Sequence, residues 1–281
     1  YQGRLKESTQ LGAELIGDSS IEADAEILAM AVESMKKAGL KEFQISVGHA
    51  GFLKGLMEAS GLDEEQEEEL RELISNKNFF GVEEVTGTLE LSEELQKLFG
   101  LLGGFYNNPE QLEEAKKYAV NYERIADALN YLTSLHEVLK QYEVENHISY
   151  ELGALSDYHF YTGIIFSGYT FGTGEPVVKG GRYDKLLKYF GKDAPAIGFA
   201  VALDQLLAAL SRQKAEPYVK QNYQLIVYEA SQRKEAITQA KARRDAGCFV
   251  ELQKLDQRKT KADYETYAKN MGMSEITWIV G

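Results

Sequence analysis

Cysteine is almost absent from this chain of 281 residues, which has only Cys248. One cysteine cannot form an internal disulfide, and it cannot build a cysteine cluster around a metal. The sequence also lacks any run of about 18 apolar residues, so we expect no membrane-spanning helix. No signal-peptide pattern opens the chain. These absences favour a cytoplasmic protein.

Positive charge is also scarce. The chain has 31 lysines and arginines against 44 aspartates and glutamates, which gives a formal net charge of −13. Proteins that bind nucleic acid obtain much of their affinity from lysine and arginine on phosphates, so we expect no nucleic-acid partner. The acidic segment 63–69 is interpreted as the solvated start of a helix rather than as a binding tail.

Motifs for metals and nucleotides are missing as well. The four histidines, at positions 49, 136, 147 and 159, do not have the spacing of metal ligands. Neither a P-loop nor a dinucleotide-binding fingerprint occurs. We therefore expect no metal site and no cofactor.

The first part of the chain predicts strand, helix and strand in turn. Residues 11–16 predict a strand in which Glu14 stands among apolar residues, and residues 43–47 predict another. Between them, apolar residues recur every three or four positions over 18–38, and Gly39 suits the end of that helix. The start at Tyr1 reads like the tip of a hairpin, so we expect further residues upstream in the natural protein.

The middle of the chain is dominated by leucine, glutamate, lysine and alanine from about residue 54 to 145. Helical periodicity recurs over 64–74, 92–102 and 109–140, with Pro109 in the first turn of the last helix. Short strands at 148–152 and 177–179, a helix at 183–189 and an apolar helix at 203–210 follow. We interpret residues 1–212 as one α+β domain that carries a helical insertion.

The end of the chain, residues 218–281, alternates regularly after a linker at Pro217. Strands and helices are predicted in the order strand 224–228, helix 233–245, strand 249–252, helix 263–271 and strand 276–280. This βαβαβ order predicts a small parallel sheet with flanking helices.

Residues 157–166, Asp-Tyr-His-Phe-Tyr-Thr-Gly-Ile-Ile-Phe, concentrate aromatic side chains around Gly163. We interpret the stretch as extended, with a glycine where a backbone or a ligand comes close. The pattern alone leaves two hypotheses open, namely buried strands of a sheet and the floor of a ligand site.

Three separated segments resemble class II aminoacyl-tRNA synthetases of the histidyl type. Residues 3–14 are similar to the second half of that family's motif 2, residues 157–166 take the place of its histidine-specific motif, and residues 198–206 resemble motif 3. The sequence Gly-Gly-Arg-Tyr-Asp at 180–184 lies between the last two. The resemblance covers essentially the whole chain, and it implies a class II synthetase-like antiparallel sheet with helices.

Two departures from the family bear on catalysis. The resemblance places Gln205 where motif 3 has an arginine for the ATP phosphates, and Ser156 where the histidine-specific motif has an arginine for the substrate carboxylate. No lysine or arginine occurs anywhere in 152–174. Losing charge stabilisation in a transition state costs about 10²–10³ in rate per group. We therefore expect no amino-acid activation.

The resemblance also implies a histidine-binding pocket. Gln10 and Glu14 stand where the synthetases read the ammonium and imidazole groups of histidine, and Phe160 and Tyr161 stand where two tyrosines wall the imidazole. A carboxylate on a buried strand needs a cation or an N–H donor, and a structural salt bridge is the alternative role for Glu14. The implied histidine-binding residues are Gln10, Glu14, Tyr158, Phe160, Tyr161, Gly180 and Gly181.

A synthetase-like chain without these arginines resembles the regulatory subunits of the short-form ATP phosphoribosyltransferase, the first enzyme of histidine biosynthesis. Residues 158–163 are close to the Gly-Tyr-His-Tyr-His-Thr-Gly stretch of that family. The resemblance implies a non-catalytic chain that self-associates as a dimer, joins the catalytic subunit in a hetero-octamer, raises its activity and responds to L-histidine. It also implies that residues 218–281 are a shortened anticodon-binding domain that no longer reads tRNA.

Two other functions remain as alternatives. One is an active histidyl-tRNA synthetase with displaced arginines, which ATP–pyrophosphate exchange would reveal. The other is a free-standing amino-acid-binding module with a different partner, which co-purification would reveal.

Overall fold

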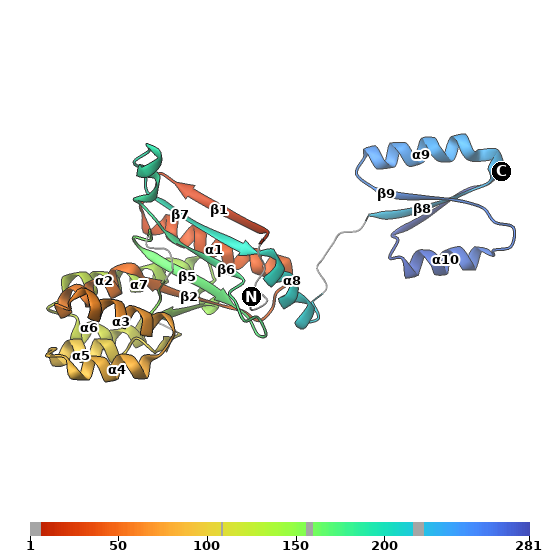
Figure 1. Ribbon diagram of the computed structural model, residues 1–281. Coiled ribbons are helices and arrows are strands. Elements are labelled where there is room, and N and C mark those ends of the chain that lie inside the picture. Colours follow the sequence, from red (N-terminus) through yellow and green to blue (C-terminus); the bar gives the residue numbers. More distant parts are fainter. Residues whose placement is uncertain (1–6, 108, 156–159, 216–221) are drawn as a thin grey trace. The chain divides into compact units, whose positions relative to one another are not determined.

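A computed structural model describes residues 7–107, 109–155, 160–215 and 222–281 (Figure 1). Contacts divide the chain into two compact units, residues 1–217 and 218–281, and each is described by itself. No helix among the described residues is both long and apolar enough to cross a membrane.

The first unit is built on a seven-stranded sheet. Every pair of neighbouring strands is antiparallel except β2 and β4, which run parallel. The strand order is β1 (Gln10–Ile16), β7 (Ala196–Ala202), β6 (Val178–Arg182), β5 (Ile164–Tyr169), β2 (Gln44–His49), β4 (Ile148–Glu151) and β3 (Phe105–Tyr106). This arrangement confirms the expected α+β fold with a predominantly antiparallel sheet.

Opposed residues on neighbouring strands point to the same side of a sheet, so the register separates two faces. One face, here the polar face, carries the cross-strand row Lys179, Ser167, Ser46 and Ser149. The other, here the apolar face, carries the row Phe199, Gly180, Phe166, Val47 and Tyr150.

Helix α1 (Ile21–Ala38) covers part of the apolar face. It begins where the side chain of Ser20 accepts a hydrogen bond from the Ala23 N–H group, and it ends at Gly39 with a φ of 101°. The left-handed backbone at its end is one that glycine adopts without a steric penalty. Figure 1 shows α1 running alongside β1, β7 and β6. The predicted helix is therefore confirmed, with its start set by the serine cap.

The helical insertion gathers at the β2 side of the sheet (Figure 1). Its helices are α2 (Ala50–Ser60), α3 (Glu64–Ser75), α4 (Phe79–Thr88), α5 (Glu93–Gly100), η1 (Pro109–Leu112), α6 (Glu113–Tyr118) and α7 (Glu123–Gln141). Helix α7 meets the apolar face, where His136 Nδ1 and the Tyr150 hydroxyl lie 3.0 Å apart. The short η2 (Glu145–His147) leads on into β4.

The prediction of one continuous helix over 109–140 was wrong, because η1, α6 and α7 are separate. Leu112, Ala115 and Ala119 are buried and recur at helical spacing. If the same helix continued, its next buried positions would be 122 and 126. The buried side chains of α7 begin instead at Ile125. The break between α6 and α7 resets this phase, so that both segments bury their apolar sides.

The sheet connections after β5 are short. The segment Leu186–Phe190 forms a single 3₁₀ turn, η3, between β6 and β7, although the sequence predicted a helix over 183–189. Helix α8 (Leu203–Arg212) follows β7 directly and confirms the predicted apolar helix. The extended conformation expected for 157–166 holds for β5 alone, since no strand includes 160–163, and residues 156–159 lie outside the described residues.

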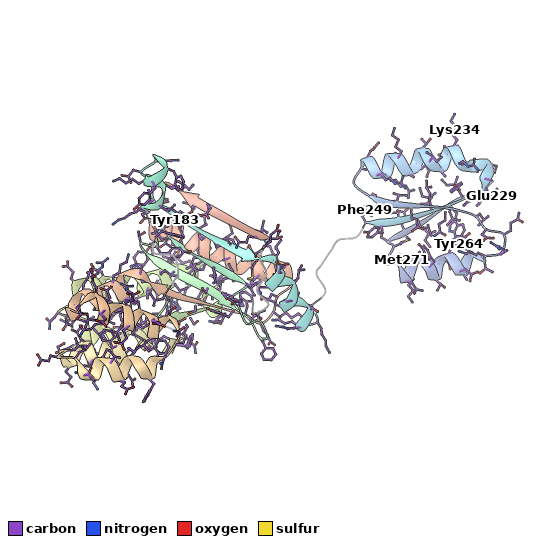
Figure 2. All side chains as sticks on the ribbon, viewed as in Figure 1. Tyr183, Glu229, Lys234, Phe249, Tyr264 and Met271 are labelled. Atoms are coloured by element: carbon purple, nitrogen blue, oxygen red, sulfur yellow. The ribbon has the colours of Figure 1, made fainter. Side chains whose placement is uncertain are left out.

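The second unit has a three-stranded parallel sheet in the order β10-β8-β9. Helices α9 and α10 pack on it through separate apolar clusters, and Tyr264 of α10, which is labelled in Figure 2, meets Trp278 of β10 edge-on. The βαβαβ order agrees with the sequence prediction. The elements are β8 (Tyr223–Tyr228), η4 (Ala230–Gln232), α9 (Arg233–Asp245), β9 (Phe249–Lys254), α10 (Lys261–Asn270) and β10 (Glu275–Ile279).

Candidate ligand site on the polar face of the sheet

One row of the polar face joins several residues that the sequence singled out. Glu14 of β1 lies opposite Gly198 of β7, and Gly198 lies opposite Gly181 of β6. A Cβ atom on Gly198 would overlap the Glu14 carboxylate, and one on Gly181 would lie 2.6 Å from Tyr161 Cε1. The two glycines therefore make a floor on which a carboxylate and an aromatic ring lie directly against the backbone.

An aromatic cluster of Phe160, Tyr161 and Tyr183 stands beside Glu14. The ring of Phe160 lies 4.6 Å from that of Tyr161 and 5.8 Å from that of Tyr183. Tyr183, marked in Figure 2, donates its hydroxyl hydrogen to Glu14 Oε2. Burial raises the pKa of the Tyr183 hydroxyl, and the adjacent carboxylate raises it further. Tyr183 thus stays a hydrogen-bond donor at neutral pH.

The expectation that Glu14 stands on a buried strand was wrong. Both Glu14 and Gln10 are exposed, and Leu11 and Ile16 are 63% and 48% exposed. Among the described residues β1 pairs only with β7, so it is an edge strand with little cover. The Glu14 carboxylate is therefore accessible to a ligand and needs no buried partner.

The remaining predicted site residues are only partly brought together. Gln10 lies on the polar face with Glu14, but the two residues are four positions apart along β1, which separates their Cα atoms by about 13 Å. Gly180 belongs to the opposite face, where a Cβ atom would lie 2.7 Å from Phe166 Cε2, and it also lines a cavity that adjoins the aromatic cluster. Tyr158 lies outside the described residues. Glu14, Phe160, Tyr161 and Gly181 form the part of the predicted site that the structure brings together.

A cavity of about 270 Å³ adjoins the aromatic cluster, and its lining includes Tyr161, Lys179, Ser46 and Glu151. Glu151 is 4% exposed. Its carboxylate accepts a hydrogen bond of 2.8 Å from the Ser46 hydroxyl and forms an ion pair with Lys77. Lys77 has a φ of 58°, an uncommon conformation for a residue with a side chain. The cavity is therefore polar and carries charges of both signs.

Tyr183, Lys179 and Glu151 are residues that the sequence argument did not assign to the site. Tyr183 and Lys179 stand two residues on either side of Gly181, so the two-residue period of a strand could have placed them on its face. Glu151 has no comparable signal, because its hydrogen-bond partner Ser46 is 105 residues away in the sequence.

Arg182 is the remaining cation of β6, and it serves the apolar face. Its guanidinium pairs with Asp24 of α1, which is fully buried, and with Asp184 at 3.0 Å. The Tyr131 hydroxyl donates to the same Asp24 carboxylate at 2.7 Å. Burial raises the pKa of Asp24, and these hydrogen bonds oppose that rise. The network fixes α1 to the sheet and leaves the Arg182 guanidinium unavailable to a ligand.

Two further positions carry the departures from the synthetase motifs. Gln205 lies in the first turn of α8, half-buried and uncharged. Ser156 lies outside the described residues. No group of three or more histidine, cysteine, aspartate or glutamate side chains in the described segments could hold a metal ion.

The comparisons with known proteins agree with this class II fold. The family model described as histidyl-tRNA synthetase matches residues 2–206. A histidyl-tRNA synthetase from Nostoc sp. PCC 7120 superposes with a TM-score of 0.71 at 16% identity, over 94% of this chain and 64% of that one, which shows the fold alone. The chain is thus a class II synthetase-like protein of the histidyl type.

Two curated relatives and one solved structure narrow the family to which the chain is assigned. An ATP phosphoribosyltransferase regulatory subunit from Desulforamulus reducens is 39% identical over 98% of this chain and 68% of the relative, and one from Acetivibrio thermocellus is 38% identical over 89% and 60%. A Bacillus halodurans structure titled as an ATP phosphoribosyltransferase regulatory subunit/histidyl-tRNA synthetase is 33% identical, with a TM-score of 0.77 over 100% of this chain and 70% of that one. The chain belongs to the family of ATP phosphoribosyltransferase regulatory subunits. It spans 60% and 65% of the length of the first two curated relatives.

Proposed function

We propose that this chain acts as the non-catalytic regulatory subunit of a short-form ATP phosphoribosyltransferase. It binds the catalytic subunit, raises its activity in the first step of histidine biosynthesis, and senses L-histidine. The observation that carries this proposal is an accessible carboxylate beside an aromatic cluster on the sheet, together with an uncharged Gln205 in α8.

Histidine sensing is assigned to the polar face around Glu14. The carboxylate of Glu14 accepts a hydrogen bond from the imidazole or ammonium group of the ligand, and Tyr161 provides an aromatic wall over Gly181. Tyr183 already donates to Glu14, and a bound cation neutralises this carboxylate, which has no ion-pair partner among the described residues. Gln10, Tyr158, Phe160 and Gly180 remain proposed members of the site.

Loss of synthetase chemistry is part of the same proposal. Adenylation requires cations at the ATP phosphates and at the substrate carboxylate, and Gln205 and Ser156 supply none. The second unit is proposed to be a shortened anticodon-binding domain. The formal net charge of −13 gives no general support for contact with tRNA phosphates.

The experiment that tests this function mixes the protein with a short-form catalytic subunit. We expect the two to elute together from a sizing column, as a hetero-octamer of four and four that includes regulatory dimers. Turnover of the catalytic subunit should rise, and histidine should lower it again. Independent elution with no gain in turnover would refute the proposal.

A further inference from the structure

An amino acid carries a carboxylate as well as an ammonium group, and a site that encloses it must meet both charges. The proposed site offers Glu14 to the positive groups. The position at which the synthetases have an arginine for the substrate carboxylate carries Ser156 and supplies no cation. The inference below rests on the proposed histidine binding and concerns this missing charge.

Lys179 is placed to provide it. It lies on β6 opposite Ala200 and Ser167, which puts its side chain on the polar face with Glu14. It is exposed, it lines the cavity together with Tyr161, and it makes no ion pair with any other described residue. Its ammonium is therefore available to a ligand that enters beside Tyr161.

Of the lysines and arginines among the described residues, only Lys77 and Lys179 line the cavity. Lys77 pairs with the buried Glu151, and Arg182 pairs with Asp24 beneath the opposite face. Lys54 of α2 donates to the Tyr161 backbone carbonyl at 3.5 Å, and its side chain does not line the cavity. Lys179 is thus the best-placed cation in the described part of the site.

The spacing suits one bound amino acid. Lys179 and Glu14 stand two strands and two residues apart, which corresponds to about 12 Å between their Cα atoms. Extended glutamate and lysine side chains both reach into that interval. Tyr161 packs on Gly181, two residues along β6 from Lys179.

We propose that Lys179 binds the ligand carboxylate while Glu14 binds its imidazole or ammonium group. The carboxylate enters the cavity beside Tyr161, and the hydroxyl of Ser167, opposite Lys179, donates a second hydrogen bond. The site is thereby selective for free α-amino acids over amines that lack a carboxylate.

The test is calorimetric titration of the wild type and Lys179→Gln with two ligands. L-Histidine has the carboxylate, and L-histidinol replaces it with a hydroxymethyl group. A hydrogen bond to a charged group predicts that Lys179→Gln binds histidine about ten- to hundred-fold more weakly. Both proteins should bind histidinol equally. Lys37→Gln, an exposed lysine of α1 on the far side of the sheet, is the matched control and should behave as wild type.

The outcomes separate the two proposals. If Glu14→Gln weakens histidine binding while Lys179→Gln does not, Lys179 is not the anchor and histidine sensing stands. If Lys179→Gln weakens histidine and histidinol alike, the lysine acts on the shape of the site and the proposed carboxylate contact is overturned. If the wild type binds no histidine, alone or with the catalytic subunit, both proposals fail together.

Discussion

The two faces of the seven-stranded sheet contrast in what they do with charge, and strand β6 shows the contrast within five residues. Arg182 points to the apolar face, where Asp24 and Asp184 neutralise it and it is 5% exposed. Lys179 points to the polar face, exposed and without an ion-pair partner among the described residues. One cation is neutralised inside the fold, and the other stays accessible on the face where we propose ligand binding.

Removing Arg182 should give the largest effect on stability. The substitution Arg182→Met keeps much of the side-chain volume but leaves the fully buried Asp24 without its cation. Breaking a buried pair in this way costs about 3–5 kcal/mol. Urea denaturation should show this loss, while Lys179→Met, on the other face of the same strand, should leave the free energy of unfolding almost unchanged. Equal losses in the free energy of unfolding for the two substitutions would contradict the conclusion that Arg182 stabilises the fold and Lys179 does not.

Glu14→Gln should affect the ligand rather than the fold. It removes the negative charge at constant volume, and a hydrogen bond to a charged group contributes ~1.5–3 kcal/mol. The response of the complex to histidine should weaken about ten- to hundred-fold, measured as inhibition of turnover. Activation without histidine should survive. If Glu14→Gln leaves histidine inhibition unchanged while a substitution in the catalytic subunit abolishes it, then histidine does not act through this pocket.

Acid should lower the stability of the fold through His49, which lies on the apolar face. The pKa of His49 falls from 6.5 to about 4, mainly because the ring is buried and secondarily because Arg124 is near. Its Nδ1 accepts the Gly51 N–H at 3.0 Å, which requires the neutral ring. Because the folded pKa lies below the unfolded one, this stability is present above about pH 6.5 and is lost as the pH falls toward 4. The loss between pH 7 and 5 should be about 2 kcal/mol.

The variant His49→Gln tests that assignment in urea denaturation at both pH values. It should remove most of the difference between pH 7 and pH 5. His147→Gln, at a histidine that stacks on Phe43, is the control and should retain the difference. A full pH dependence in His49→Gln would assign the effect to another group.

Sequence reasoning recovered the elements whose periodicity is local. Helix α9 has the predicted bounds, and Gly39 ends α1 as expected. It failed where the answer depends on pairing between distant segments. The exposure of Glu14 follows from the edge position of β1, and the cavity depends on Glu151 meeting Ser46 and Lys77 from other elements. The residue pattern of one strand does not say which strands lie beside it or in which register they pair.

The division between binding and catalysis is tested most directly by ATP–pyrophosphate exchange with L-histidine. In the proposed site Glu14 binds histidine on the polar face, but the uncharged Gln205 leaves the ATP phosphates without the cation that adenylation requires. We predict no exchange above a buffer control at any histidine concentration. Exchange that depends specifically on histidine would contradict the account and identify an active synthetase.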